Sequence, residues 1–258
     1  MAENEVNRYR EVEERPPRSG LALLGLAIAV VAALVVILAG PLSRIGLWEF
    51  GTGFQILKWG SYLAIAGAVI GILGVLRSRP LGPRRGMGLA ILAIVIGLVV
   101  AYVPWSWKRK AETVPPIHDI TTDTINPPAF VAVLPLRSEA PNPPQYGGDS
   151  IAQQQKEAYP EVQPLALDLP PEQAFARAFE AAREMGWEIV SADARSRRIE
   201  ATDTTFWFGF KDDIVVRVAP AAGGSRIDVR SVSRVGRSDV GTNATRIKEY
   251  LAKVREST

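Results

Sequence analysis

The sequence contains no cysteine and only one histidine among its 258 residues. The absence of cysteine excludes disulfides, thiolate nucleophiles and cysteine-ligated zinc. The single histidine, His118, is followed by Asp119 and Asp123, and could supply one general base or one metal ligand. Because no second imidazole exists, we expect these residues to fix a loop by local hydrogen bonds. We predict no metal site, no cofactor and no catalytic residue.

The charge is also small, and it is unevenly distributed. The formal net charge is +3. Residues 1–107 contain 10 Lys and Arg and 6 Asp and Glu, whereas residues 108–258 contain 20 Lys and Arg and 21 Asp and Glu. The basic excess therefore belongs to the apolar N-terminal part. A nucleic-acid-binding domain would normally be basic itself, so we do not expect a nucleic acid as partner.

Long uncharged runs dominate the first 107 residues. They hold 25 residues between Arg18 and Arg44, 18 between Lys58 and Arg77, and 22 between Arg85 and Lys108. About 20 apolar residues are needed to cross a bilayer as a helix. The runs predict three transmembrane helices within residues 19–107, at about 21–40, 59–76 and 87–104. A cleaved signal peptide is the alternative for the first run, but its length and the two runs that follow favour a retained span.

The flanking arginines predict the orientation of these spans, because positive residues near a span are retained in the cytoplasm. Residues 1–18 and the loop between the second and third spans are rich in arginine, which predicts a cytoplasmic tail at 1–18. The third span then crosses from the cytoplasmic to the opposite side of the membrane, and residues 108–258 form an extracytoplasmic domain. This describes a multi-pass inner-membrane protein, although Lys108, Arg109 and Lys110 oppose that orientation.

Small residues recur at four-residue spacing within the spans, at Gly25, Ala29 and Ala33 and again at Gly67 and Gly71. Such spacing lets helices approach closely. No Asp, Glu, Lys, Arg or His lies inside a span, and ion pathways usually require such residues. The pattern favours a compact anchor over a transporter.

The remaining residues predict a small α+β domain. A proline-rich segment, residues 113–164, precedes it and includes an apolar run at 130–134 that is compatible with a short strand. Periodicity then predicts, in chain order, a strand at 162–169, a helix at 172–185, four strands at 187–192, 198–202, 214–219 and 226–233, and a helix at 244–254. The order β-α-β-β-β-β-α indicates an antiparallel sheet with its helices packed on one face.

Arginines alternate along the last predicted strand and continue into the turn that follows it. Ile227 and Val229 point to one face, whereas Arg230 and Arg234 point to the other. One interpretation is a solvated face with ion pairs to Asp212, Asp213 and Asp228. The other is an anion-binding site at the start of the following helix. The residues predicted to bind are Arg230, Arg234, Arg237, Ser238, Asp239 and Asn243.

An aromatic cluster lies between two of the predicted strands. It consists of Phe206, Trp207, Phe208 and Phe210. Such a cluster is more often core or hairpin packing than a platform for a ligand.

Five motifs in this part of the chain resemble the domain-of-unknown-function 1499 family. They are HDITTD at 118–123, NPPAF at 126–130, AYPEVQPL at 158–165, ATDTTFWFGFKDDIVVRV at 201–218 and RIDVRSVSRVGRSDVGTNATRI at 226–247. The resemblance covers most of residues 115–254. It implies a membrane-associated or exported domain without an assigned reaction, here in a member with three N-terminal transmembrane helices.

Three functions are compatible with this organisation. The first is a non-enzymatic module at the bacterial envelope that recognises a protein or anionic lipid partner while its helices lie in the lipid bilayer. The second is an envelope hydrolase for an anionic substrate, with Asp203, Asp212 or Asp213 acting beside an arginine oxyanion clamp. The lack of cysteine, and of histidine inside the domain, removes the commonest nucleophile and base pairs and favours the first. The third is an assembly factor for a membrane complex.

Overall fold

The computed structural model describes residues 17–78 and 85–256. The arginines at 8, 10, 15, 79 and 84, on which the predicted orientation depends, lie outside the described residues. The chain divides into two compact units, residues 1–108 and 109–258.

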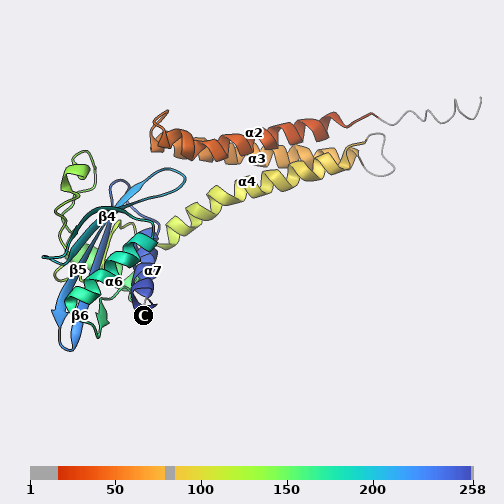
Figure 1. The fold of residues 1–258 in the computed structure, drawn as a ribbon. Helices are drawn as coiled ribbons and strands as arrows, with labels where there is room; N and C mark the ends of the chain where they lie inside the picture. Colours follow the sequence, from red (N-terminus) through yellow and green to blue (C-terminus); the bar gives the residue numbers. More distant parts are fainter. Residues whose placement is uncertain (1–16, 79–84, 257–258) are drawn as a thin grey trace, which may run out of the picture. The chain divides into compact units, whose positions relative to one another are not determined.

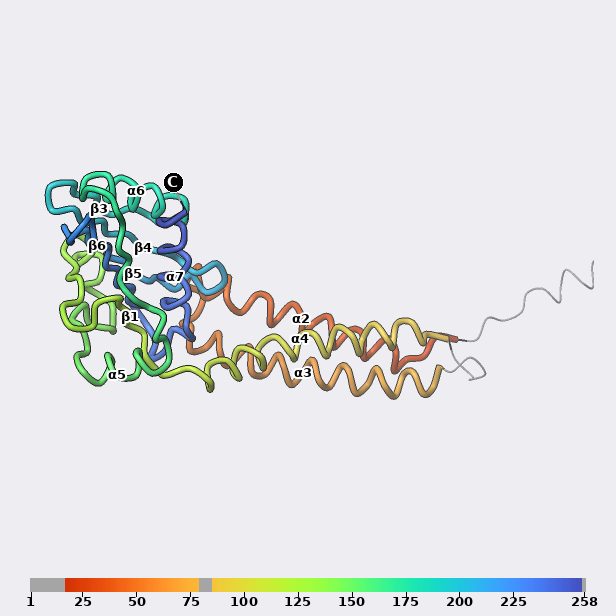
Figure 2. Tube along the Cα trace, turned by 90° about the horizontal axis from the view of Figure 1, so that it is seen from below, coloured from red at the N-terminus to blue at the C-terminus, as the bar shows by residue number. Residues whose placement is uncertain are grey.

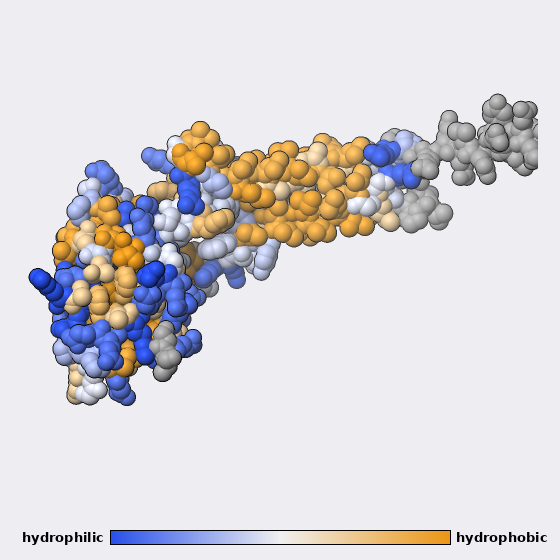
Figure 3. All heavy atoms as spheres, viewed as in Figure 1, coloured by the Kyte–Doolittle hydropathy of each residue, from blue (hydrophilic) through white to orange (hydrophobic). Residues whose placement is uncertain are grey.

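Three long helices make up the first unit: α2 (Gly20–Arg44), α3 (Phe50–Arg77) and α4 (Met87–Thr113), whose last five residues belong to the second unit. Each is long and apolar enough to cross a membrane. Hydrophobic side chains cover most of their visible surface (Figure 3). Because a protein exposed to water would not leave so many large apolar side chains uncovered, this surface indicates a lipid bilayer environment. The helices extend beyond the predicted spans, since α3 begins nine residues earlier and α4 continues through Pro104 to Thr113.

Small residues bring these helices together, as their spacing predicts. A Cβ atom added to Gly25 would lie 2.9 Å from the backbone nitrogen of Gly71, and one added to Gly97 would lie 2.5 Å from the carbonyl of Ala64. Both distances are too short for a side chain, so the helix backbones touch there. The third predicted position was wrong by one residue, because Ala32 is buried and Ala33 only half-buried, as a period of 3.6 residues dictates.

The second unit is an α+β domain built on one antiparallel sheet, which confirms the predicted fold class (Figure 1). Its main strands are β3 (Glu188–Asp193), β4 (Arg198–Thr204), β5 (Lys211–Ala221) and β6 (Gly224–Ser233). Two short strands, β1 (Asp119–Thr121) and β2 (Leu165–Leu167), both pair with the outer edge of β6. The order across the sheet is β1-β6-β5-β4-β3, with β2 beside β1 on that edge.

Helices α6 (Pro171–Glu184) and α7 (Thr242–Glu256) cover one face of this sheet and bury the main core. Ile227 and Val229 of β6 point into this core and are fully buried, as their alternation predicts. Trp187 stacks on Tyr250 of α7, with ring centroids 4.8 Å apart. The Tyr250 hydroxyl donates to the carbonyl of Ala178 in α6 at 2.8 Å. This bond ties the two helices together through the core.

The proline-rich segment covers the opposite face of the sheet (Figure 2). Phe130 and Val133 are buried there against Val215 of β5 and Val232 of β6. The predicted strand at 130–134 was wrong. The chain instead turns into the 3-10 helix η1 (Leu134–Arg137), because Pro135 cannot donate to a strand ladder.

A further helix, α5 (Asp149–Ala158), was not predicted in the proline-rich segment. Its Gln155 is buried and clamps the short strand β1. The side-chain oxygen of Gln155 accepts from Thr121 N at 2.9 Å, and its amide nitrogen donates to the Thr121 carbonyl at 2.7 Å. Gln155 therefore takes the place of a neighbouring strand at this edge of β1.

Candidate functional site

The arginine-bearing face of the sheet is buried beneath the proline-rich segment, and its arginines are held by carboxylates. Arg230 donates to both carboxylate oxygens of Asp119, from Nε at 2.9 Å and from Nη2 at 2.7 Å. It also donates to the carbonyls of Pro128 and Pro144, and its guanidinium lies over the rings of Phe130 and Tyr146. Its side chain is 3 % exposed. Arg230 therefore fastens the proline-rich segment to β6.

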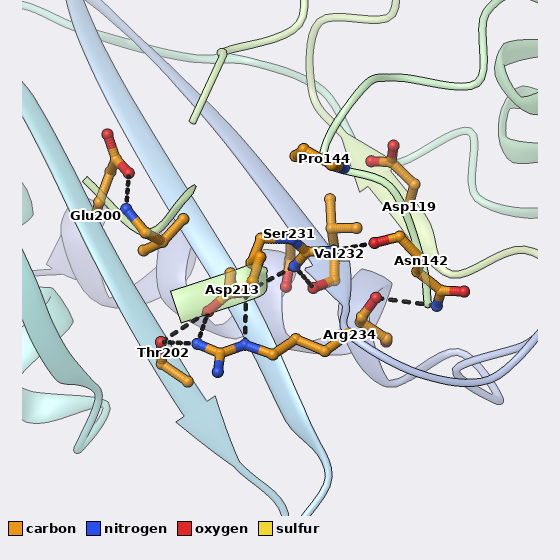
Figure 4. Close-up of polar contacts among 12 residues, drawn as sticks. Asp119, Asn142, Pro144, Glu200, Thr202, Asp213, Ser231, Val232 and Arg234 are labelled. Atoms are coloured by element: carbon orange, nitrogen blue, oxygen red, sulfur yellow. Dashed lines mark hydrogen bonds and ion pairs between the residues drawn. The ribbon is translucent and has the colours of Figure 1, made fainter. Parts of the chain in front are cut away.

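Arg234 is fixed in the same way, to a different carboxylate (Figure 4). Its Nε and Nη2 donate to the two oxygens of Asp213 at 2.9 and 2.7 Å. Asp213 also accepts from Arg137 of η1 at 2.6 Å and from the Thr202 hydroxyl at 2.7 Å. Burial alone would raise the pKa of Asp213, but the hydrogen bonds from Arg234, Thr202 and Arg137 hold it below the usual value. Arg230 and Arg234 thus serve separate ion pairs and do not converge on one point.

The turn between β6 and α7 contains Arg237, Ser238 and Asp239, and Asn243 lies in the first turn of α7. Asp239 accepts from Gly241 N at 2.9 Å and from Asn243 N at 2.7 Å, so it caps the start of α7. Burial raises the pKa of Asp239 despite these two bonds. Ser238 accepts from Val240 N at 3.1 Å and donates to the Pro115 carbonyl at 3.4 Å. Asp239 and Ser238 therefore hold this turn to the helix and to the chain before β1.

Asn243 is fully buried, and its side chain links this turn to β6 and to the chain before β1. Its amide nitrogen donates to the His118 carbonyl at 3.0 Å and to the Ser233 hydroxyl at 3.1 Å, and its side-chain oxygen accepts from Ser231 at 2.7 Å. Arg237 alone among the six predicted residues is exposed. Its carbonyl oxygen lies 3.5 Å from the His118 ring.

Arg246 of α7 organises a second buried network that sequence reasoning missed. It donates to Asp203 from Nε at 2.8 Å and to Asp212 from Nη2 at 2.7 Å, and it also bonds Ser231 and Asn243. Burial alone would lower the pKa of Arg246, but the carboxylates of Asp212 and Asp203 raise it. A signal was present, because Arg246 falls beside Ile247 on the face of α7 that the helical period turns toward the sheet.

Of His118, Asp119 and Asp123, only Asp123 fixes its own loop by local hydrogen bonds, because Asp119 pairs with Arg230, 111 residues away, and the His118 ring lies by the Arg237 carbonyl. Asp123 accepts from Ile125 N at 3.1 Å and from Asn126 N at 2.8 Å, and it pairs with Arg217 and Arg226. Burial alone would raise the pKa of Asp123, but the two backbone bonds and the arginines lower it. Within residues 17–78 and 85–256, no three His, Asp or Glu side chains gather as metal ligands would.

Comparison with known proteins gives one result for this domain. The model of a family described as a protein of unknown function, DUF1499, matches residues 119–254. No curated protein matches the chain. The matched range contains both arginine networks and the turn between β6 and α7.

Proposed function

The chain belongs to the DUF1499 family, whose function is unknown, and from this premise we propose that it is a membrane-anchored, non-enzymatic binding or assembly module at the bacterial envelope. The three apolar helices would hold it in the inner membrane with its N-terminus in the cytoplasm. The α+β domain would then face the other side and recognise a protein or anionic lipid partner.

The observation that carries this proposal is the exposed Arg237 on a turn that is fixed from several sides. Val240 in this turn has φ of +54°. A β-branched residue rarely adopts this conformation, which costs about 1–3 kcal/mol and persists only where the surroundings impose it. Here Ser238, Asp239 and Asn243 impose it through the hydrogen bonds described above. A rigid turn presents Arg237 to an anionic group at little further cost in entropy.

The geometry of the carboxylates favours binding over hydrolysis. Arg246 forms ion pairs with Asp203 and Asp212, and Arg137 and Arg234 form ion pairs with Asp213. A general base needs a pKa near the working pH, whereas the pKa of Asp213 is lowered. Arg230 and Arg234, which an oxyanion clamp would use, are likewise paired with Asp119 and Asp213.

The orientation can be tested by cysteine labelling, which is specific because the chain has no cysteine of its own. Ala222 lies exposed in the turn between β5 and β6. We expect Ala222→Cys to react with a membrane-impermeant maleimide in intact cells. An Asn7→Cys variant, in the tail, should react only after permeabilisation. The reverse pattern would place the domain in the cytoplasm and contradict the proposed location.

The binding site can be tested with Arg237→Ala. Because Arg237 is exposed, we expect this variant to keep the stability of the parent protein while it loses a partner that crosslinks or copurifies with the parent from intact membranes. Proteins and anionic lipids should both be quantified by mass spectrometry. Arg183→Ala is the matched control, since Arg183 is an exposed arginine on α6 of the same domain, with a side chain 61 % exposed. Equal recovery of every partner with both variants would refute the role of Arg237.

A further inference from the structure

The aromatic residues between β4 and β5 form the tip of a hairpin. Phe210 N donates to the Thr205 hydroxyl at 2.8 Å, and Thr205 N donates to the Phe210 carbonyl at 2.8 Å, which closes the loop. Phe208 stacks on Phe210 with centroids 5.2 Å apart, and Trp207 packs edge-on against Phe208. Phe206 is 90 % exposed. A large apolar side chain this exposed, beside three other rings, is unusual for a surface that faces only water.

This aromatic tip, residues 205–210, lies at the end of the sheet where the chain enters the domain. Ser233 N donates to the His118 carbonyl at 3.0 Å, and Arg234 N donates to the Lys211 carbonyl at 2.9 Å. The end of β6, the start of β5 and the residue before β1 therefore lie together. The turn between β5 and β6 lies at the opposite end of the sheet (Figure 1). With 11 residues in β5, the two ends are about 35 Å apart.

The chain itself limits how far this end can lie from the bilayer. Lys108 is the first charge after the third apolar run, and α4 continues to Thr113. Pro115 is already held to the domain, because its carbonyl accepts from Ser238. Six helical residues and two extended ones reach no more than about 16 Å. The covalent chain alone therefore keeps Pro115, at the end of the sheet that carries the aromatic tip, within about 16 Å of Lys108.

The two ends of the sheet carry different side chains, and those at the end where the chain enters the domain suit a membrane surface. The tether end carries four aromatic rings with Lys211 and Arg237 exposed nearby, whereas the opposite end has Ala222 and Gly223 in one turn and 194–197, Ala-Arg-Ser-Arg, in the other. Aromatic rings favour the headgroup region of a bilayer, where their apolar bodies are buried and their edges stay wet. Lys211 and Arg237 beside them complement lipid phosphates. The rings distinguish the two ends and the cations do not, because the opposite end carries Arg195 and Arg197.

We infer that the aromatic tip inserts into the headgroup region of the bilayer that the chain's own helices span. It gives the domain a second point of attachment and fixes which of its surfaces face away from the membrane. The inference rests on the aromatic rings and on the length of the tether, with Arg237 only one of two cations beside the rings, and it holds for either orientation of the chain.

The test compares two single-cysteine variants of the full-length protein, Phe206→Cys and Ala222→Cys, each labelled with the fluorophore NBD and reconstituted in lipid nanodiscs. We expect blue-shifted NBD emission at 206 that is lost when the nanodiscs contain lipids with a quencher near the headgroup. At 222 we expect emission typical of water and no quenching. Unchanged circular dichroism spectra would verify that both labelled proteins are folded.

Three results would overturn the inference. Emission typical of water at 206 would show that the tip stays outside the bilayer. Blue-shifted emission at 206 without quenching would mean that protein, not lipid, covers the tip. Equal quenching at 206 and 222 would show that the domain lies on the membrane without the orientation inferred here.

Discussion

Replacing Asp213 by alanine is expected to lower the free energy of unfolding of the α+β domain by about 3–5 kcal/mol. Asp213 is fully buried and accepts hydrogen bonds from Arg137, Arg234 and Thr202. Its removal leaves two arginines facing each other at a place that water does not reach, which is the costly way to break a buried ion pair. The full-length protein in detergent can be measured by pulse proteolysis across a urea series.

The matched control for this prediction is Glu180→Ala. Glu180 pairs with Arg183 on the surface of α6, and its side chain is 58 % exposed. Exposed pairs contribute about 0–1 kcal/mol, so the control should unfold close to the parent protein. A loss for Asp213→Ala no larger than for Glu180→Ala would show that the buried network does not stabilise the domain.

Asp213→Asn adds a pH dependence whose sign follows from the lowered pKa of Asp213. A carboxylate with a lowered folded-state pKa contributes stability that is present above its unfolded pKa, about 3.9, and is lost as the pH falls through the folded value. The stability difference between the parent and Asp213→Asn should therefore be largest above about pH 4 and shrink in more acidic solution.

The sequence predicted the sheet and its helices well because their signals are local. Alternation in Ile227 and Val229 identified the core face of β6, and apolar spacing identified α6 and α7 to within three residues at each end. Both patterns arise from burial against one continuous core, so the polarity of each residue indicates whether its side chain faces that core. The fold class followed from the order of these elements.

The sequence could not predict what covers the arginine face. Asp119 and Arg230 are 111 residues apart, and Arg137 and Asp213 are 76 apart. Such pairs leave no periodic trace in either segment, and the proline-rich segment has neither a helical nor a strand period to show that it packs. Arginines that alternate with apolar residues look the same from the sequence whether they face water or buried carboxylates. The six predicted binding residues were therefore grouped by sequence, whereas in the structure five of them are half or fully buried parts of the fold and Arg237 is exposed.

The second large effect is expected for Arg246→Met. Asp203 of β4 and Asp212 of β5 lie directly opposite each other in the sheet, where two like charges repel. Arg246 bridges them from α7, so methionine, which fills a similar volume without charge, should leave the carboxylates to face each other. Asp212 is buried and cannot be solvated instead. We expect a loss of about 3–5 kcal/mol in the free energy of unfolding, measured as for Asp213→Ala.

A double variant separates the repulsion from the loss of packing. If the cost of Arg246→Met comes from the unpaired carboxylates, then Asp212→Asn should be harmful in the parent, where it removes an ion pair, but should restore about 1–3 kcal/mol when added to Arg246→Met. Asp203 provides the matched comparison, because its side chain is 33 % exposed and water can solvate it. Asp203→Asn should therefore restore less than Asp212→Asn. Losses that simply add in the double variant would mean that Arg246 acts through packing, and that the facing aspartates are tolerated without it.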